Sequence, residues 1–229
     1  MRAFAALLAL VPAGAYAQTP DELRASCEPF LTVVYEGCRV ENFSRCADGS
    51  TYSETYEQGE PPSLSLVDAE ANTLFSLTEV LNDGMFSLEI GPDPISISQL
   101  LETGRDTFSQ TAQMGIEDVG SWKISFDGTY ILDGGRVVID GVSLLTGTVT
   151  LAAILQTVPP SPISLDGEIF VDPATMMIIL GDSIAISQDA TEDDQATPQQ
   201  FIWLGESGFF STDLDTICAP TLSKEAPSP

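Results

Sequence analysis

The chain has 229 residues, of which 34 are Asp or Glu, 8 are Lys or Arg, four are Cys and none is His. Its formal net charge of −26 excludes a broad basic surface, so we expect no binding to nucleic acid or to anionic lipid through Lys and Arg. The missing histidine excludes Ser-His-Asp and Cys-His catalysis, His-ligated zinc and histidine pH switching. With 43% hydrophobic and 18% charged residues the composition is that of a folded protein, and one domain is expected.

Residues 1–17 have the pattern of a secretory signal peptide. Arg2 is followed by a short apolar run that ends in Ala15-Tyr16-Ala17, and cleavage is expected after Ala17. The apolar run is too short for a membrane anchor. We therefore expect a periplasmic or extracellular mature chain that begins at Gln18, with one β-rich domain over residues 18–218 and a disordered tail over 219–229.

The mature chain begins with a strong helix signal. Thr19 stands at the N-cap position, Pro20 at the first helical position and Glu22 at capping-box spacing. Pro29 is expected to end this helix near Glu28, because a proline ring clashes with the carbonyl four residues back.

All four cysteines lie in the mature part, and an even number in an exported chain indicates two disulfides. Three pairings are open. The seven residues between Cys38 and Cys46 favour a local bond, which leaves Cys27 with Cys218. A zinc cluster is disfavoured, because no C-x-x-C spacing and no histidine is present.

The rest of the chain is dominated by β patterns, in which apolar and polar residues alternate with period two. Such strands are predicted at 86–90, 122–133 and 163–171, with hairpin turns at 82–84, 133–135 and 181–182. A twelve-residue strand is about 40 Å long, which suits a curved sheet. The predicted fold class is mainly β, with an antiparallel curved sheet that forms an open half-barrel or a sandwich, an N-terminal helix and one short internal helix.

Four further segments complete the expected organisation. The uncharged stretch Val142–Leu165 is interpreted as a buried strand rather than a transmembrane segment, because it carries several Thr and lacks a basic flank. A helix capped by Asp93 and ended by Gly104 is the expected internal helix. Residues 188–200 are expected to form a surface loop, and 219–229 the tail.

The long strand at 122–133 supplies the candidate ligand face. Its even positions are apolar and would lie on one side of the sheet: Trp122, Ile124, Phe126, Tyr130 and Leu132. The leading hypothesis is therefore a secreted or periplasmic protein without catalytic activity, a binding or envelope-associated module. Its ligand would be an apolar small molecule or lipid held against this face.

Two alternatives use the abundant carboxylates. Asp166 and Glu168 share one strand face at a spacing that a glycan hydrolase could use as acid and base, and Asp127 lies similarly beside Lys123. With so many acidic residues, a solvated strand face is the competing interpretation.

A structural or adhesive surface domain that depends on calcium is the other alternative. Four carboxylates fall within six positions at Asp189, Glu192, Asp193 and Asp194, and carboxylate oxygens are calcium's usual ligands. The segment lacks the spacing and the glycine of an EF-hand loop. No other cofactor is indicated.

Overall fold

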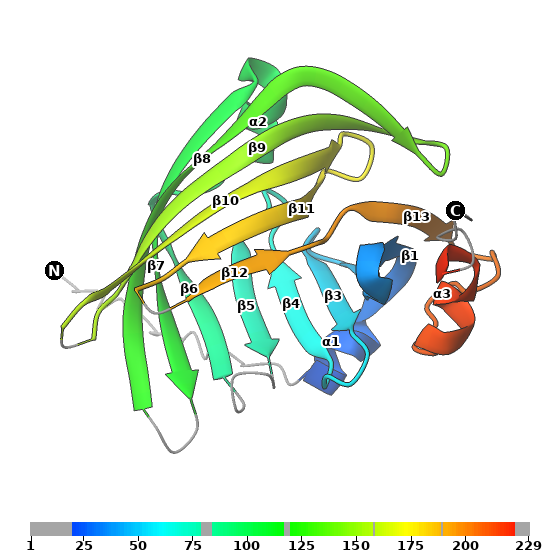
Figure 1. Ribbon diagram of the computed structural model, residues 1–229, viewed down its shortest axis with the longest axis horizontal. Coiled ribbons are helices and arrows are strands. Elements are labelled where there is room, and N and C mark those ends of the chain that lie inside the picture. The colour runs from blue at the N-terminus through cyan, green and yellow to red at the C-terminus, as the bar shows by residue number, and fades with distance from the viewer. Residues whose placement is uncertain (1–19, 79–83, 117–119, 158, 189, 223–229) are drawn as a thin grey trace, which may run out of the picture.

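The computed structural model describes residues 20–78, 84–116, 120–157, 159–188 and 190–222. The predicted signal peptide, the N-cap residue Thr19 and most of the predicted tail lie outside these ranges. The described chain is mainly β with a few short helices (Figure 1). The helical elements are α1 (Pro20–Ser26), the 3-10 turn η1 (Glu36–Cys38), α2 (Ile97–Thr103) and α3 (Leu214–Leu222).

In the described ranges, thirteen antiparallel strands follow one another in a single hydrogen-bonded order, β12-β11-β10-β9-β8-β7-β6-β5-β4-β3-β2-β1-β13. Their bounds are β1 (Cys27–Tyr35), β2 (Val40–Cys46), β3 (Thr51–Tyr56), β4 (Ser63–Val67), β5 (Thr73–Thr78), β6 (Gly84–Asp93), β7 (Arg105–Ile116), β8 (Gly120–Ile139), β9 (Val142–Leu155), β10 (Ser161–Asp172), β11 (Met177–Ile186), β12 (Thr191–Asp194) and β13 (Pro198–Trp203).

The sheet curves back on itself and forms two open six-stranded halves. Strands β13 and β1–β5 form one half, strands β7–β12 form the other, and β6 joins them. Figure 1 shows the long strands β8–β10 arching over the shorter strands β1–β4. Within the described residues the end strands β12 and β13 do not pair with each other, so the sheet is not closed into a barrel. The prediction of an antiparallel, mainly β fold is confirmed.

The core lies between the two halves. Inward-facing Leu31, Val33 and Tyr35 of β1 pack with Phe170 of β10 and Ile179 of β11 in one apolar cluster. The short helix α2 fills a second cluster under β8–β11. Its buried residues Ile97 and Leu100 contact the inner side of that half. The outer face of β1, β2 and β13 is covered by the C-terminal segment with α3.

Two disulfides form, but the expected pairing is wrong. Cys27 is bonded to Cys46 and Cys38 to Cys218. Cys27 and Cys46 lie directly opposite each other in the β1–β2 ladder, with their Cα atoms 4.1 Å apart. Because β2 is extended, Cys38 and Cys46 lie more than about 20 Å apart along the chain and cannot form a local loop. Short sequence spacing was therefore a poor guide.

The helix predictions are partly confirmed. Helix α1 begins at Pro20 as expected, but it ends at Ser26, before Pro29, because Cys27 already pairs in β1. Helix α2 ends at Gly104, which has φ 78°, as predicted, but its N-cap is Ser96 and not Asp93. Residues up to Leu222 of the predicted tail belong to α3.

Two predicted hairpin turns and the predicted loop are wrong. Residues 133–135 form a bulge inside β8, and the chain reverses at 140–141 instead. Residues 181–182 lie within the continuous strand β11, where the two of them form a bulge opposite the single residue Glu168 of β10. Within the expected loop at 188–200, residues 191–194 form β12 and residues 198–200 begin β13, because each strand finds an unpaired sheet edge. The turn at 82–84 falls largely outside the described residues.

The long uncharged segment at 142–165 is mostly strand, as predicted, but it is divided between two strands: residues 142–155 form β9 and residues 161–165 begin β10. Nowhere in the described part of the chain is a helix long and apolar enough to cross a membrane. The predicted long strand at 122–133 is also confirmed, since it lies within the 20-residue strand β8.

Candidate ligand-binding cavity

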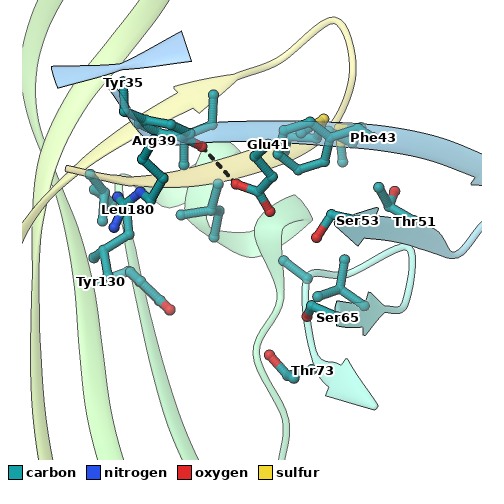
Figure 2. A pocket seen from close by; sticks show the side chains of 17 residues that line it. Tyr35, Arg39, Glu41, Phe43, Thr51, Ser53, Ser65, Thr73, Tyr130 and Leu180 are labelled. Carbon is teal, nitrogen blue, oxygen red and sulfur yellow. Dashed lines mark hydrogen bonds between the residues drawn. The ribbon is translucent and has the colours of Figure 1, made fainter. Parts of the chain in front are cut away.

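A cavity of about 280 Å³ lies between the two halves of the sheet. One wall comes from the inner face of β1–β5, and the other comes mainly from β10, β11 and the turn between them (Figure 2). This volume is just below the usual range of ligand pockets, about 300–1,000 Å³. The cavity is therefore matched to a small ligand.

Glu41 brings a carboxylate into this cavity because of the period-two alternation of β2. Val40 and Asn42 face the outer side, where Asn42 donates to the Ser211 carbonyl, so Glu41 and Phe43 face inward. The Glu41 carboxylate accepts a 2.8 Å hydrogen bond from the Tyr35 hydroxyl. Figure 2 shows the carboxylate pointing into the space between Tyr130 and Ser53.

The environment of Glu41 acts on its pKa in two directions. Burial raises the pKa, while hydrogen bonds from Ser53 and Tyr35 and the charge of Arg39 oppose this effect without cancelling it. Burial, together with the charge of Glu41 and the hydrogen bond to it, also raises the pKa of Tyr35 well above its ordinary value, so the Tyr35 hydroxyl stays protonated at neutral pH. The pair therefore presents a hydrogen-bonded carboxyl group in an environment that disfavours its charge.

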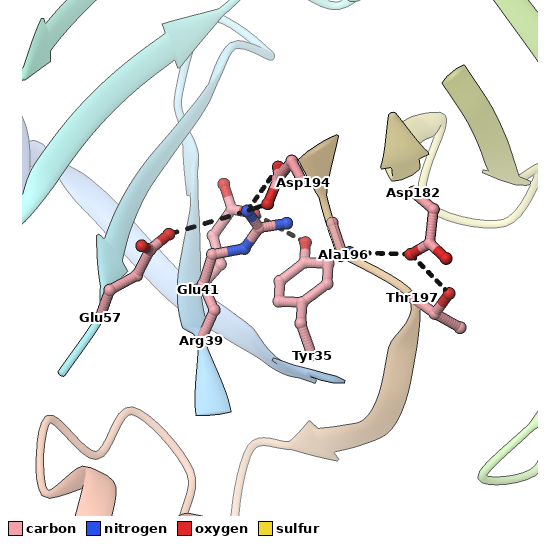
Figure 3. Close-up of polar contacts among 8 residues, drawn as sticks. All are labelled: Tyr35, Arg39, Glu41, Glu57, Asp182, Asp194, Ala196 and Thr197. Carbon is pink, nitrogen blue, oxygen red and sulfur yellow. Dashed lines mark hydrogen bonds and ion pairs between the residues drawn. The ribbon is translucent and has the colours of Figure 1, made fainter. Parts of the chain in front are cut away.

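Arg39 lies at the edge of the cavity, where the two ends of the sheet approach each other. Its guanidinium makes two hydrogen bonds to the Asp194 carboxylate of β12, at 2.9 and 3.2 Å, and a longer ion pair to Glu57 at 3.7 Å (Figure 3). It also lies 4.7 Å from the centre of the Tyr35 ring. The pKa of Arg39 is raised by these carboxylates despite burial, so Arg39 remains charged.

We call this junction the seam: Arg39, Asp182, and residues 194–197, which connect β12 to β13. Asp182 of β11 accepts from the Ala196 backbone N–H and from the Thr197 hydroxyl, both at 2.9 Å. The Thr197 carbonyl accepts from the Glu36 backbone N–H at 2.9 Å. Side chains and a short connection thus hold together the two sheet ends that backbone pairing leaves open.

The wall from β1–β5 is rich in hydroxyl groups. Ser53 lies opposite Ser65 in the β3–β4 ladder, and Thr51 lies opposite Val67, which itself lies opposite Thr73 of β5. Ser53, Ser65, Thr51 and Thr73 all line the cavity. Figure 2 shows their hydroxyl groups along one side of the space that the Glu41 carboxylate enters. This wall can donate and accept hydrogen bonds.

The opposite wall is apolar and contains flexible side chains. Ile169 of β10, Met176 of the connecting turn, and Met177 and Ile179 of β11 contribute to it. Methionine adapts its shape readily to an apolar partner. The cavity is therefore amphipathic, with a carboxylate and hydroxyl groups facing a thioether and aliphatic wall.

The five residues of the predicted ligand face all belong to β8, but they do not form one binding surface. Of its five residues, Tyr130 lines the cavity. Ile124 and Phe126 pack into a cluster with Phe108, and Leu132 packs beside α2. Trp122 is half-buried near the start of β8. The ligand role of this face stays a prediction.

The predicted calcium residues are not brought together around one point. Asp189 lies outside the described residues, and Asp194 is engaged by Arg39. Glu192 and Asp193 are neighbours on the short strand β12 and therefore project to opposite faces. In the described ranges no group of three or more His, Cys, Asp or Glu has an arrangement that could hold a metal ion.

The predicted hydrolase pair lies on the outer face of the long-stranded half. Asp166 and Glu168 are exposed on β10 and border a shallow depression together with Asp182 and Asp193. Asp127 and Lys123 are exposed on β8. This acidic surface is separate from the interior cavity, and the hydrolase alternative stays a prediction.

Sequence reasoning missed the principal cavity residues: Tyr35, Arg39, Glu41, Ser53 and Met177. The sequence of β2 carries no clear signal for them, because both of its faces mix apolar and polar residues: Glu41 and Phe43 share their face with Arg45.

Comparison of the chain with protein-family models, with curated proteins and with solved structures finds no match. A functional conclusion therefore depends on the chemistry of the cavity.

Proposed function

We propose that this protein binds a small amphipathic molecule in the cavity between the two sheet halves and acts as a carrier or binding module rather than a catalyst. The observation that carries the proposal is the composition of the two cavity walls. Glu41 and the hydroxyl groups of β3–β5 face Met177 and Ile179 across an interior space of about 280 Å³. Concave, partly apolar sites with a few converging polar groups are typical of small-molecule binding.

The cysteines support an extracytoplasmic setting. Two disulfides tie the fold together, and the described residues contain no free cysteine. Such bonds form and persist in oxidising compartments. Together with the predicted signal peptide, they support a periplasmic or extracellular role, where small apolar molecules need a carrier to cross water.

The proposal is tested with prodan, a neutral fluorescent probe whose emission shifts in apolar surroundings. The expected result is saturable binding to the wild type and loss of binding in Ser65→Phe, because the new ring occupies the cavity. Ser164→Phe adds the same ring at an exposed position of β10 and serves as the matched control. The smaller filler Ser65→Leu gives the same test if the phenyl ring lowers the melting temperature.

The outcomes separate an interior site from a surface site. Binding that survives in both Ser65 variants and disappears in Ser164→Phe places the probe on the outer face and contradicts the proposal. Absence of saturable binding by the wild type, combined with no small molecule in native mass spectra of protein purified from its exporting host, also contradicts it.

A further inference from the structure

We infer that the ligand of this cavity carries a protonated amine, so that the site selects small alkylammonium compounds over alcohols and carboxylates of equal length. The inference rests on the proposed function and specifies the ligand's polar group. It follows from how the charges around the cavity are already paired.

Glu41 has hydrogen-bond partners but no cation of its own. The Tyr35 hydroxyl donates to one carboxylate oxygen at 2.8 Å, and the Ser53 hydroxyl lines the same cavity. Within the described residues no salt bridge reaches Glu41. Glu41 is half-buried, and a carboxylate partly withdrawn from water without a paired cation is costly; this cost is recovered when an ammonium group binds beside it.

Arg39 is not available to supply this compensation. Its guanidinium is engaged by Asp194 at 2.9 Å and by Glu57 at 3.7 Å. Glu57 and Asp194, which lie outside the cavity lining, therefore already balance the one guanidinium, and Glu41 adds a third carboxylate on the cavity wall. This imbalance favours a cation and repels an anion, and a fatty-acid headgroup would face Glu41 without a free positive partner.

The hydroxyl-bearing wall fits an ammonium group as well. An ammonium has three donors and no acceptor, and the oxygens of Glu41, Ser53 and Ser65 can accept from it. The alkyl part would lie against Met177 and Ile179 on the opposite wall. The small cavity limits the ligand to a short chain.

The test measures binding of octylamine, octanol and octanoate by calorimetry at neutral pH and about 150 mM salt, where the Debye length is about 8 Å. The expected order is amine first, alcohol second and carboxylate last. We expect the amine to bind at least about tenfold more tightly than the alcohol, since a charge-assisted hydrogen bond contributes more than a neutral one. Glu41→Gln is expected to reduce this ratio to near unity.

The matched control is Glu168→Gln, which removes one exposed carboxylate from the outer face. It separates a specific amine site from the general attraction of amines to a chain of net charge −26. The control variant should keep the wild-type ratio. An equal loss of the amine preference in both variants, or its disappearance at about 1 M salt, overturns the inference because long-range attraction is screened at that concentration.

The wild-type ranking alone is decisive if Glu41→Gln does not fold. Equal affinity for amine and alcohol, or tightest binding of octanoate, overturns the amine inference but leaves the cavity as a ligand site. Failure of all three compounds and of prodan to bind overturns the proposed function as well.

Discussion

Removing the Cys38–Cys218 disulfide should destabilise the fold more than removing Cys27–Cys46. A disulfide stabilises largely by restricting the unfolded chain, and the effect grows with the logarithm of the loop length. The two bonds close loops with sequence separations of 180 and 19 residues. At 25 °C the chain-entropy relation gives about 5 kcal/mol for the long loop and about 3 kcal/mol for the short one.

The double variants Cys38→Ala/Cys218→Ala and Cys27→Ala/Cys46→Ala measure this difference. Each pair contains one buried sulfur, since Cys218 is 1% and Cys27 is 6% exposed, so the cost of the lost sulfur is similar in both. Urea unfolding of the two variants should give free energies of unfolding that differ by about 2 kcal/mol. The long-loop variant should be the less stable.

An equal loss in the two variants, or a larger loss for Cys27→Ala/Cys46→Ala, would refute this reasoning. That result would mean that residual structure in the unfolded chain, or packing of the β1–β2 ladder, outweighs loop length. Peptide mapping of the oxidised wild type supplies the control, because it must recover the bonds Cys27–Cys46 and Cys38–Cys218.

Three further predictions concern the seam, the cavity and the core. Arg39→Met should lower the free energy of unfolding by about 1 kcal/mol, as expected for a partly exposed ion pair. In urea titrations the difference in the free energy of unfolding between wild type and Arg39→Met should be smaller at high salt than at low salt. A difference that does not change with salt would argue against an ionic seam. Burial raises the pKa of Glu41, so the folded state holds this proton more tightly than the unfolded state, and wild-type stability falls as pH rises from the ordinary Glu value through the raised pKa. The free energy of unfolding of Glu41→Gln minus that of wild type should therefore increase with pH over that interval. A decrease of this difference with pH would contradict a raised pKa of Glu41 in the folded state. Leu100→Ala should cost about 2–5 kcal/mol because Leu100 is fully buried between α2 and the long-stranded half; a thermal melt close to that of wild type would show that α2 does not hold the core.

Local patterns predicted the elements whose signals lie within a short segment. The start of α1 at Pro20, the αL residue Gly104 after α2, and the one-sided alternation of β8 depend on neighbours a few residues away. The same patterns failed where a distant partner decides the outcome. Residues 133–135 resemble a turn, yet pairing with β9 continues on both sides of them and converts them into a bulge.

The cavity and the disulfides required information that a single segment does not contain. Glu41 and Met177 are far apart in sequence and meet only because the sheet curves back on itself. Arg39 finds Asp194 across 155 positions of chain. Alternation shows that Glu41 and Phe43 share a face of β2, but it shows neither that this face is the inner one nor which strand lies opposite.

The most direct test of the interior ligand site is an NMR titration of the methyl groups with prodan. The structure predicts saturable shifts of Met177 and Ile179, which line the cavity, and little change at Ile154 and Ile184, which are about half-exposed at 49% and 47%. Saturable shifts confined to Ile154 and Ile184, or no saturable shift at Met177 and Ile179, would contradict the account.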